Sequence, residues 1–136
     1  MDVYQAQVKP LAGTNYKELH KKAFGLYDKI RKKSKRRPYV RSVYFGKQKI
    51  FLQLFWNHLH KKNFRDRTRR LKYFPCAIEL IQHSRHDPWM KQTLEKPHEL
   101  LFRFKGKTKE GKIFFVQIKE EIRSQEKWLV SIFPED

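Results

Sequence analysis

Four polar side chains in the C-terminal part of the chain have the types that RNA cleavage requires. They are His98, Arg103, Lys119 and Ser131. Attack of an RNA 2′-hydroxyl on the adjacent phosphate needs a base for the hydroxyl proton, cations for the pentacoordinate phosphate and an acid for the leaving 5′-oxygen. Imidazoles exchange protons near neutral pH, so His98 is the candidate acid/base. Arg103 and Lys119 would stabilise the charge, and Ser131 would hydrogen-bond a phosphate oxygen. The reaction needs no metal or other cofactor, because the nucleophile belongs to the substrate.

Two basic segments offer further contacts to phosphates. The chain holds 32 Lys and Arg against 14 Asp and Glu, a net charge of +18, whereas solubility needs only about 2–8 charges in a small domain. This surplus favours a polyanionic partner, with nucleic acid preferred to an anionic membrane and RNA preferred to DNA. The expected nucleic-acid contacts are Arg31, Lys32, Lys33, Lys35, Arg36, Arg37, Arg65, Arg67, Arg69, Arg70 and Lys105.

Other interpretations of these residues stay open. The solvent-facing side of a sheet ordinarily carries Arg, Lys and Ser without an active site, and the chain would then be a non-catalytic RNA- or DNA-binding protein. The same charge would also suit an acidic inhibitor protein as a partner. Metal binding is not expected, because His58 and His60 point apart on a helix, and His83 and His86 straddle the end of a helix.

Length and cysteine content indicate the cellular setting. A chain of 136 residues fits one domain with a proper core. Cys76 is the only cysteine, so an internal disulfide is excluded and a reducing compartment is expected. No apolar run approaches the roughly 18 residues of a membrane span, and the first ten residues lack the apolar core of a signal peptide. We expect a cytoplasmic protein, which a dedicated secretion system could still deliver to another cell as an effector.

The elements that must position these side chains begin with an N-terminal helix. Residues 1–13 are expected to form a loose or docking segment, and Thr14 to cap the helix that follows. The apolar positions of this helix are Leu19, Ala23, Phe24, Tyr27 and Ile30. Pro38 should end it after the basic run. We expect residues 1–38, the helix and basic run, to form one compact unit with an α+β domain at 39–136.

Beyond Pro38 the spacing is helical in the middle of the chain and strand-like at its end. The expected helices are 47–61, 64–72 and 76–84, after a short strand at 39–45. The expected C-terminal strands are 99–105, 112–120 and 127–133. This order predicts an α+β fold in which N-terminal helices pack on a C-terminal antiparallel sheet.

Strand alternation divides the C-terminal strands into two faces, because side chains two residues apart point the same way. The apolar positions, expected to pack on the helices, are Leu100, Phe102 and Phe104, then Phe114, Val116 and Ile118, then Trp128, Val130 and Ile132. The opposite face is mixed and carries Arg103, Gln117, Lys119 and Ser131. The candidate catalytic residues of the strands are therefore expected on one face of the sheet.

The order of elements resembles a known family. It runs from Phe74-Pro75-Cys76-Ala77-Ile78-Glu79-Leu80-Ile81, through a break at Asp87-Pro88 and a strand with Arg103, to Val116-Gln117-Ile118-Lys119-Glu120 and Leu129-Val130-Ser131-Ile132-Phe133-Pro134. This pattern, over about residues 40–136, resembles the phage and mobile-element nuclease branch of the barnase–EndoU–colicin–RelE superfamily.

The resemblance implies a fold and an activity. Members have helices followed by a curved antiparallel sheet, and most characterised members are metal-independent ribonucleases that often act as toxins. Carried over to this chain, the early histidine of the family would be His98, the basic strand positions Arg103 and Lys119, and the late hydroxyl Ser131. The resulting prediction is a metal-independent endoribonuclease, a toxin or mobile-element effector, that cleaves RNA through its 2′-hydroxyl.

Overall fold

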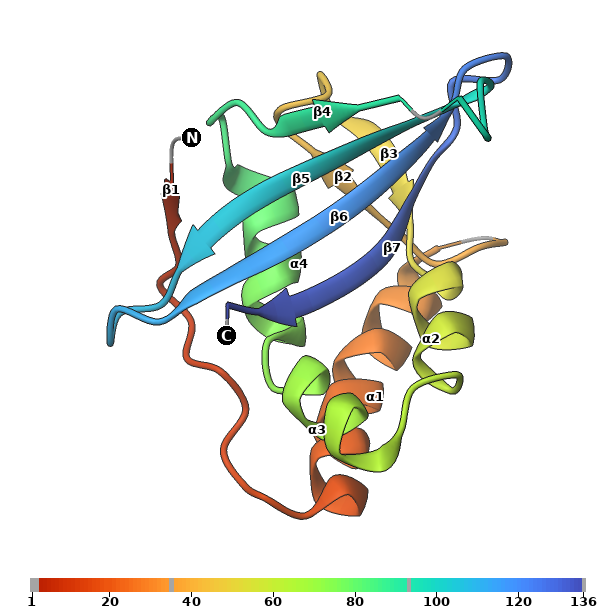
Figure 1. The fold of residues 1–136 in the computed structure, drawn as a ribbon. Coiled ribbons are helices and arrows are strands. Elements are labelled where there is room, and N and C mark those ends of the chain that lie inside the picture. Colours follow the sequence, from red (N-terminus) through yellow and green to blue (C-terminus); the bar gives the residue numbers. More distant parts are fainter. Residues whose placement is uncertain (1–2, 35, 93, 136) are drawn as a thin grey trace.

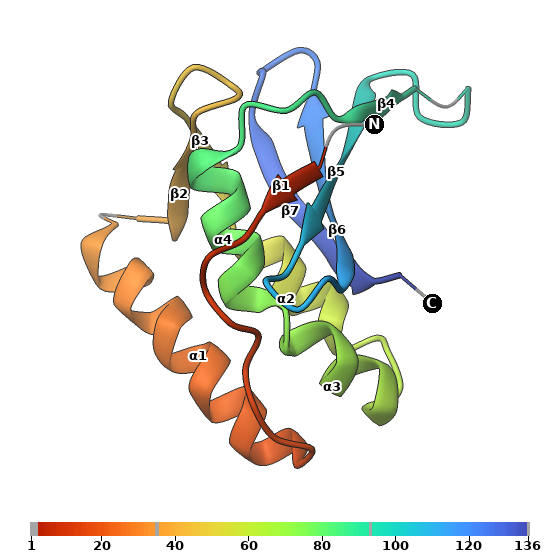
Figure 2. The same cartoon turned by 90° about the vertical axis from the view of Figure 1, so that its left-hand side faces the viewer.

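Helices gather on one face of a curved sheet (Figure 1). This computed structural model describes residues 3–34, 36–92 and 94–135. The helices in this part of the chain are α1 (Tyr16–Lys33), α2 (Gln53–Leu59), α3 (Phe64–Leu71) and α4 (Phe74–His83). Turned by 90°, the molecule shows these helices on the same side of the long strands (Figure 2). The predicted α+β fold is confirmed.

The sheet is mixed, with long antiparallel strands at its centre and short strands at its edges. The strands are β1 (Val3–Gln5), β2 (Tyr39–Ser42), β3 (Gln48–Phe51), β4 (Trp89–Lys91), β5 (Glu99–Lys107), β6 (Ile113–Glu121) and β7 (Lys127–Pro134). Their order is β1-β5-β6-β7-β3-β2, and β4 also pairs with β5. β1 joins β5 and β3 joins β7 in parallel, while every other pairing is antiparallel. The predicted antiparallel arrangement is confirmed for the C-terminal strands β5, β6 and β7, and the two parallel pairings make the whole sheet mixed.

Helix α1 begins and ends at other residues than the spacing predicted. Asn15, rather than Thr14, caps the helix, since its side chain accepts a hydrogen bond from the Lys17 N–H at 2.9 Å. The last helical residue is Lys33, well before Pro38. The Ser34 hydroxyl donates to the carbonyl of Ile30 at 3.0 Å, so this side chain occupies the carbonyl that a further turn would use. The end of the basic run is thus a connection to β2 rather than helix.

The segment predicted as one helix at 47–61 contains a strand and a shorter helix. Residues 48–51 form β3, which pairs with β2 on one side and β7 on the other, and α2 follows from Gln53. Ile50 and Leu52 are fully buried. The predicted strand 39–45 also ends early, at Ser42, where a turn with positive φ at Gly46 and Lys47 leads into β3. Pairing with β2 and with the distant strand β7 buries this segment, which local spacing does not reveal.

The predicted alternation is confirmed for β5 and β6 and is wrong for part of β7. Phe102 and Phe104 of β5 and Phe114, Val116 and Ile118 of β6 are all buried in the main core. Such burial typically contributes about 1.5–3 kcal/mol for each large apolar side chain.

A β-bulge explains the difference in β7. Gln117 of β6 pairs with Ser131, but Ile118 pairs with Leu129, so Val130 is an extra residue in β7. Leu129 is therefore buried, and Val130 is only half-buried. Beyond the bulge the predicted phase holds, because Ile132 is buried and Ser131 is on the opposite face.

The N-terminal segment docks against the rest of the fold. β1 extends the sheet beside β5, and the Glu79 carboxylate of α4 accepts hydrogen bonds from the Tyr4 hydroxyl at 2.5 Å and from the N–H groups of Gln7 and Val8 at 2.9 and 2.8 Å. Among the described residues, none of the helices combines the length and apolar character needed to cross a bilayer.

Candidate nucleic-acid interface

A row of polar side chains crosses the sheet on the face turned away from α4. We call this the outer face, and its first row is Trp89, Arg103, Gln117 and Ser131, which are in register across β4, β5, β6 and β7. The Nε and Nη2 atoms of Arg103 both donate to the Oε1 atom of Gln117 at 3.1 Å. From α3, Arg70 Nη1 donates to Ser131 Oγ at 2.8 Å. Two arginines from separate elements are therefore held in place on one face.

Aromatic rings surround these arginines. Phe115 and Phe133 stack with centroids 5.3 Å apart and planes at 30°, and both rings are half-buried. The Arg103 guanidinium lies 5.2 Å from the Trp89 ring, 5.9 Å from Phe115 and 5.6 Å from Phe133. Arg70 lies 5.6 Å from Phe133. Rings and guanidinium planes on an open strand surface can stack with unpaired bases, and the same cations attract phosphates.

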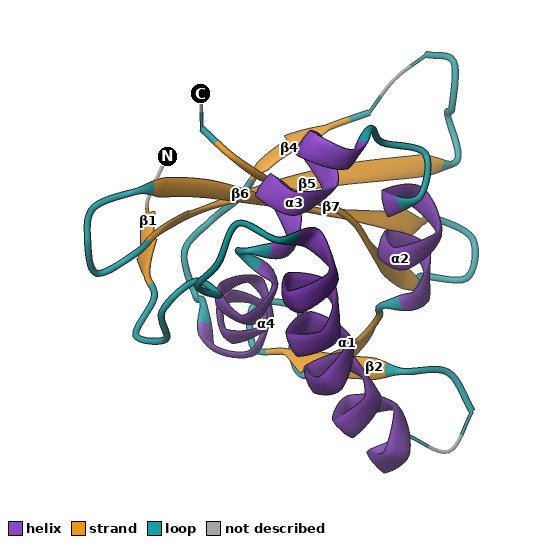
Figure 3. Ribbon diagram, turned by 90° about the horizontal axis from the view of Figure 1, so that it is seen from below, coloured by secondary structure: helices purple, strands orange, loops and turns teal. Residues whose placement is uncertain are grey.

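A groove borders this row where α2 meets the sheet. α2 packs beside β7 (Figure 1 and Figure 3). On the outer face, Lys119 Nζ lies 3.1 Å from the Glu99 carboxylate and 5.4 Å from the Trp128 ring. The groove has a volume of about 290 Å³, and its lining residues are His58, Lys91, Glu95, Lys96, Glu99, Leu100, Leu101, Lys119 and Val130. A histidine and a lysine thus face one cavity at the edge of the outer face.

The surroundings of His58 favour its neutral form. Burial, and then the positive charges of Lys61, Lys119, Lys62 and Lys96, lower the pKa of His58 from its ordinary value. Both causes disfavour the imidazolium, because one removes water and the other adds like charge. A neutral imidazole at neutral pH can accept a proton, as a general base must.

The structure brings together three of the four predicted catalytic residues but not the histidine. Arg103, Lys119 and Ser131 lie on the outer face. His98 is an exposed residue before β5, and its carbonyl accepts the Ile122 N–H at 2.8 Å. Arg103 is five positions after His98 in the chain, which is about 16 Å at the rise of an extended strand. His58, rather than His98, lines the groove together with Lys119.

The predicted contacts in α3 have different surroundings. Arg65 is exposed, and Arg67 donates to two backbone carbonyls of the preceding loop at 2.8 and 3.2 Å. Asp66 lies 3.9 Å from Arg69 and 3.2 Å from the Nε of Arg70. Asp66 therefore orients Arg70 toward Ser131, so that Arg70 is the α3 cation that reaches the outer face in the described contacts.

The predicted contacts at the end of α1 also differ from one another. Arg31 and Lys32 both pair with the Asp28 carboxylate, so much of their charge is neutralised locally. Lys33 and Arg36 instead line a groove beside β2. The run is therefore divided between cations paired within the helix and cations that face a groove.

The remaining predicted contacts are Lys105, Arg37 and Lys35. Lys105 is in register with Phe115, so it extends the outer face beyond the Arg103 row. Arg37 pairs with Glu126 of the β6–β7 turn at 2.5 Å. Lys35 lies outside the described residues. Lys105 thus extends the basic outer face toward β1.

Sequence reasoning missed His58 and the aromatic surface for different reasons. Phe115 lies two residues before Gln117 and Phe133 two residues after Ser131, so strand alternation alone places this stacked pair on the mixed face. His58 follows the helical spacing of Leu54, Phe55 and Leu59, and that spacing places it with core positions. Only the packing of α2 beside β7 turns this histidine toward Lys119.

Among the described residues, no group of three His, Cys, Asp or Glu side chains is arranged to hold a metal ion.

Comparisons with known proteins do not extend this description. The chain matches no family model, no curated protein and no solved structure. The resemblance to the barnase–EndoU–colicin–RelE superfamily stays a prediction from the order of elements.

Proposed function

We propose that the protein is a metal-independent endoribonuclease that binds single-stranded RNA on its outer face. The observation that carries this proposal is the groove in which His58, with a lowered pKa, faces Lys119. The groove adjoins the row of Arg103, Gln117 and Ser131, so a base, an ammonium group and guanidinium groups share one surface. These are the groups that cleavage through the 2′-hydroxyl requires.

The proposed reaction assigns a role to each side chain. Neutral His58 accepts the proton of the 2′-hydroxyl while the 2′-oxygen forms a bond to phosphorus. The bond from phosphorus to the 5′-oxygen breaks, and the Lys119 ammonium protonates the departing oxygen. Arg103 stabilises the negative charge that develops on the phosphate. The products are a 2′,3′-cyclic phosphate and a free 5′-hydroxyl, and DNA, which has no 2′-hydroxyl, is not cleaved.

The first experiment separates the two histidines. Purified protein is incubated with mixed RNA, and separately with single-stranded DNA, in EDTA. We expect RNA fragments that end in 2′,3′-cyclic phosphate, a rate lowered about 10²–10⁴-fold by His58→Ala and an unchanged rate in the matched control His98→Ala. Cleavage that persists in His58→Ala, or that is lost in His98→Ala, would overturn the assignment of the base.

A second candidate function is RNA binding without cleavage. It is favoured by the stacked pair of Phe115 and Phe133 beneath Arg103, which would hold bases whether or not a bond is broken. In that case RNA stays intact at every protein concentration. It still binds the protein in a gel-shift assay, and Phe115→Ala weakens that binding.

A further inference from the structure

The outer face continues beyond the groove of His58 to the far edge of the sheet. Lys119 of β6 is in register with Trp128 of β7, Trp128 with Phe51 of β3, and Phe51 with Tyr39 of β2. Residues paired in register point to the same face of a sheet. These side chains therefore form a second row, mostly aromatic, that runs from the proposed cleavage site to β2.

This row ends in a groove with a volume of about 530 Å³, which we call the second groove. Its lining residues are Lys33, Arg36, Arg37, Tyr39, Lys49 and Phe51. The Arg37 guanidinium lies 3.8 Å from the centroid of the Phe51 ring, and Lys49 Nζ lies 4.7 Å from that of Tyr39. The lining thus combines two aromatic rings with cations held over them, the same chemistry as the Arg103 row.

Within the described part of the chain, most cations that line the second groove have no ion-pair partner. Glu126 partners Arg37. For Lys33, Arg36 and Lys49, no carboxylate of the described residues lies within ion-pair distance. Arg31 and Lys32, in the preceding turn of α1, are by contrast both paired with Asp28. Unpaired cations around a hollow are suited to an anionic ligand, because binding would remove their mutual repulsion.

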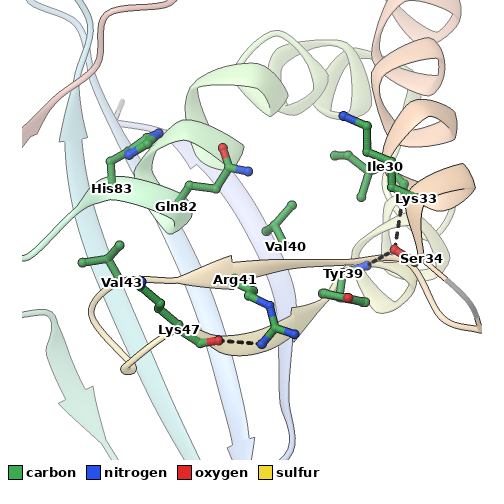
Figure 4. Close-up of a pocket in the computed structure, with 10 residues that line it drawn as sticks. All are labelled: Ile30, Lys33, Ser34, Tyr39, Val40, Arg41, Val43, Lys47, Gln82 and His83. Carbon is green, nitrogen blue, oxygen red and sulfur yellow. Dashed lines mark hydrogen bonds between the residues drawn. The ribbon is translucent and has the colours of Figure 1, made fainter.

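Hydrogen bonds fix the backbone that carries these cations, from the end of α1 to the β2–β3 turn (Figure 4). The Ser34 hydroxyl accepts the Tyr39 N–H at 3.4 Å and so connects the end of α1 to the start of β2. Arg41 Nη1 donates to the Lys47 carbonyl at 2.9 Å across the β2–β3 turn. Lys33 and Tyr39 also line the adjoining pocket in this view, which extends the basic surface around the edge of β2. A bound phosphate would therefore contact cations whose backbone is held in place.

We infer that the second groove binds the phosphates of the same RNA strand on one side of the scissile bond. This inference rests on the proposed function. Three strand spacings of about 4.8 Å separate Lys119 from Tyr39, or about 14 Å across the sheet. An extended single strand spans that distance in a few nucleotides, with a base stacked on Trp128 and phosphates near Lys33, Arg36 and Lys49. Short RNA would fill only the cleavage site.

The test compares two triple variants with equal loss of charge. The second-groove variant is Lys33→Gln, Arg36→Gln, Lys49→Gln. The control is Lys9→Gln, Lys17→Gln, Lys21→Gln, whose residues are exposed and not part of this groove. On α1 alone, Lys17 lies about 24 Å from Lys33 at the helical rise. Equal melting temperatures establish that both variants fold.

Each protein is titrated with a labelled RNA dinucleotide, the short RNA, and with labelled single-stranded RNA of about 16 nucleotides, the long RNA. Both carry His58→Ala for this binding measurement, so that the RNA stays intact. We expect the second-groove variant to bind the long RNA at least about tenfold more weakly and the short RNA unchanged. Its slope of log affinity against log salt should fall by about 0.7 for each phosphate that is no longer neutralised, or about 2 for three phosphates. The control should change both values much less.

Two outcomes would overturn the inference. One is equal weakening in both variants, which would reduce the effect to net charge. The other is unchanged affinity for the long RNA. Failure of the proposed function is a separate result, because it is read from cleavage of the short RNA by proteins that keep His58. Weaker binding of long RNA in the second-groove variant without any cleavage would retain the groove as an RNA site and reject the ribonuclease.

Discussion

The two faces of β5 and β6 are built from alternate residues of the same strands, but they differ in how deeply their side chains are buried. On the inner face, Phe114, Val116 and Ile118 are completely or almost completely buried. On the outer face, Phe115 and Gln117 are half-exposed and lie against Arg103. Neighbouring residues therefore contribute either to the core or to the proposed RNA surface. This separation makes stability and RNA binding independently testable within one strand.

The largest effect on stability is expected on the inner face. Phe114→Ala removes a fully buried ring that stacks with Tyr73 at 5.6 Å and fills the space above Gly106. Loss of the ring and the resulting cavity should lower the free energy of unfolding by about 3–5 kcal/mol. Urea denaturation followed by circular dichroism measures this. A loss below about 1 kcal/mol would show that the inner face does not dominate the core.

Substitution of the neighbouring residue, Phe115, should weaken RNA binding more than it lowers stability. Phe115→Ala removes a half-exposed ring of the outer face, so RNA affinity should fall by about 1–3 kcal/mol for the base that stacks there. The free energy of unfolding should change by less than Phe114→Ala changes it. Fluorescence anisotropy with single-stranded RNA and the same urea titration give both values. An unchanged affinity would remove Phe115 from the binding surface.

The pH dependence of cleavage tests the groove at the edge of the outer face. His58 must be neutral to accept a proton, and burial together with neighbouring lysines lowers its pKa. The kcat/KM for RNA should therefore stay constant as the pH falls through about 6.5, the ordinary value for histidine. It should decline, tenfold per unit, only below the lowered pKa. A decline that begins above that ordinary value would contradict the environment assigned to His58.

The smallest expected effect on RNA binding is at Lys105. It is in register with Phe115 at the end of the outer face, away from the groove of His58. Lys105→Gln should weaken RNA binding slightly and lower the salt slope by about 0.7, the value for one phosphate contact in a single strand. Cleavage of a short RNA should be unaffected. An unchanged slope would place the edge of the binding surface before Lys105.

Much of the fold was accessible from the sequence, because its signals are local. Period-two alternation in β5 and β6 identified the buried face correctly, including Phe102 and Val116. The same rule failed in β7, because Val130 is an additional residue in this strand and no local sequence pattern indicates it. β3 was assigned to a helix because Ile50, Phe51 and Leu54 also satisfy helical spacing. Its strand conformation comes from pairing with β2 and β7.

The candidate site was predicted in part for the same reason. The sequence by itself determined the charge, the α+β order and the placement of Arg103, Gln117 and Ser131 on one face. These follow from composition and from residue spacing within single segments. Only the tertiary structure decided that α2 turns His58 toward Lys119, that Arg70 reaches Ser131, and that Trp128, Phe51 and Tyr39 form one row. These contacts join segments far apart in the chain, whose relative position depends on strand pairing and helix packing, which residue periodicity does not encode.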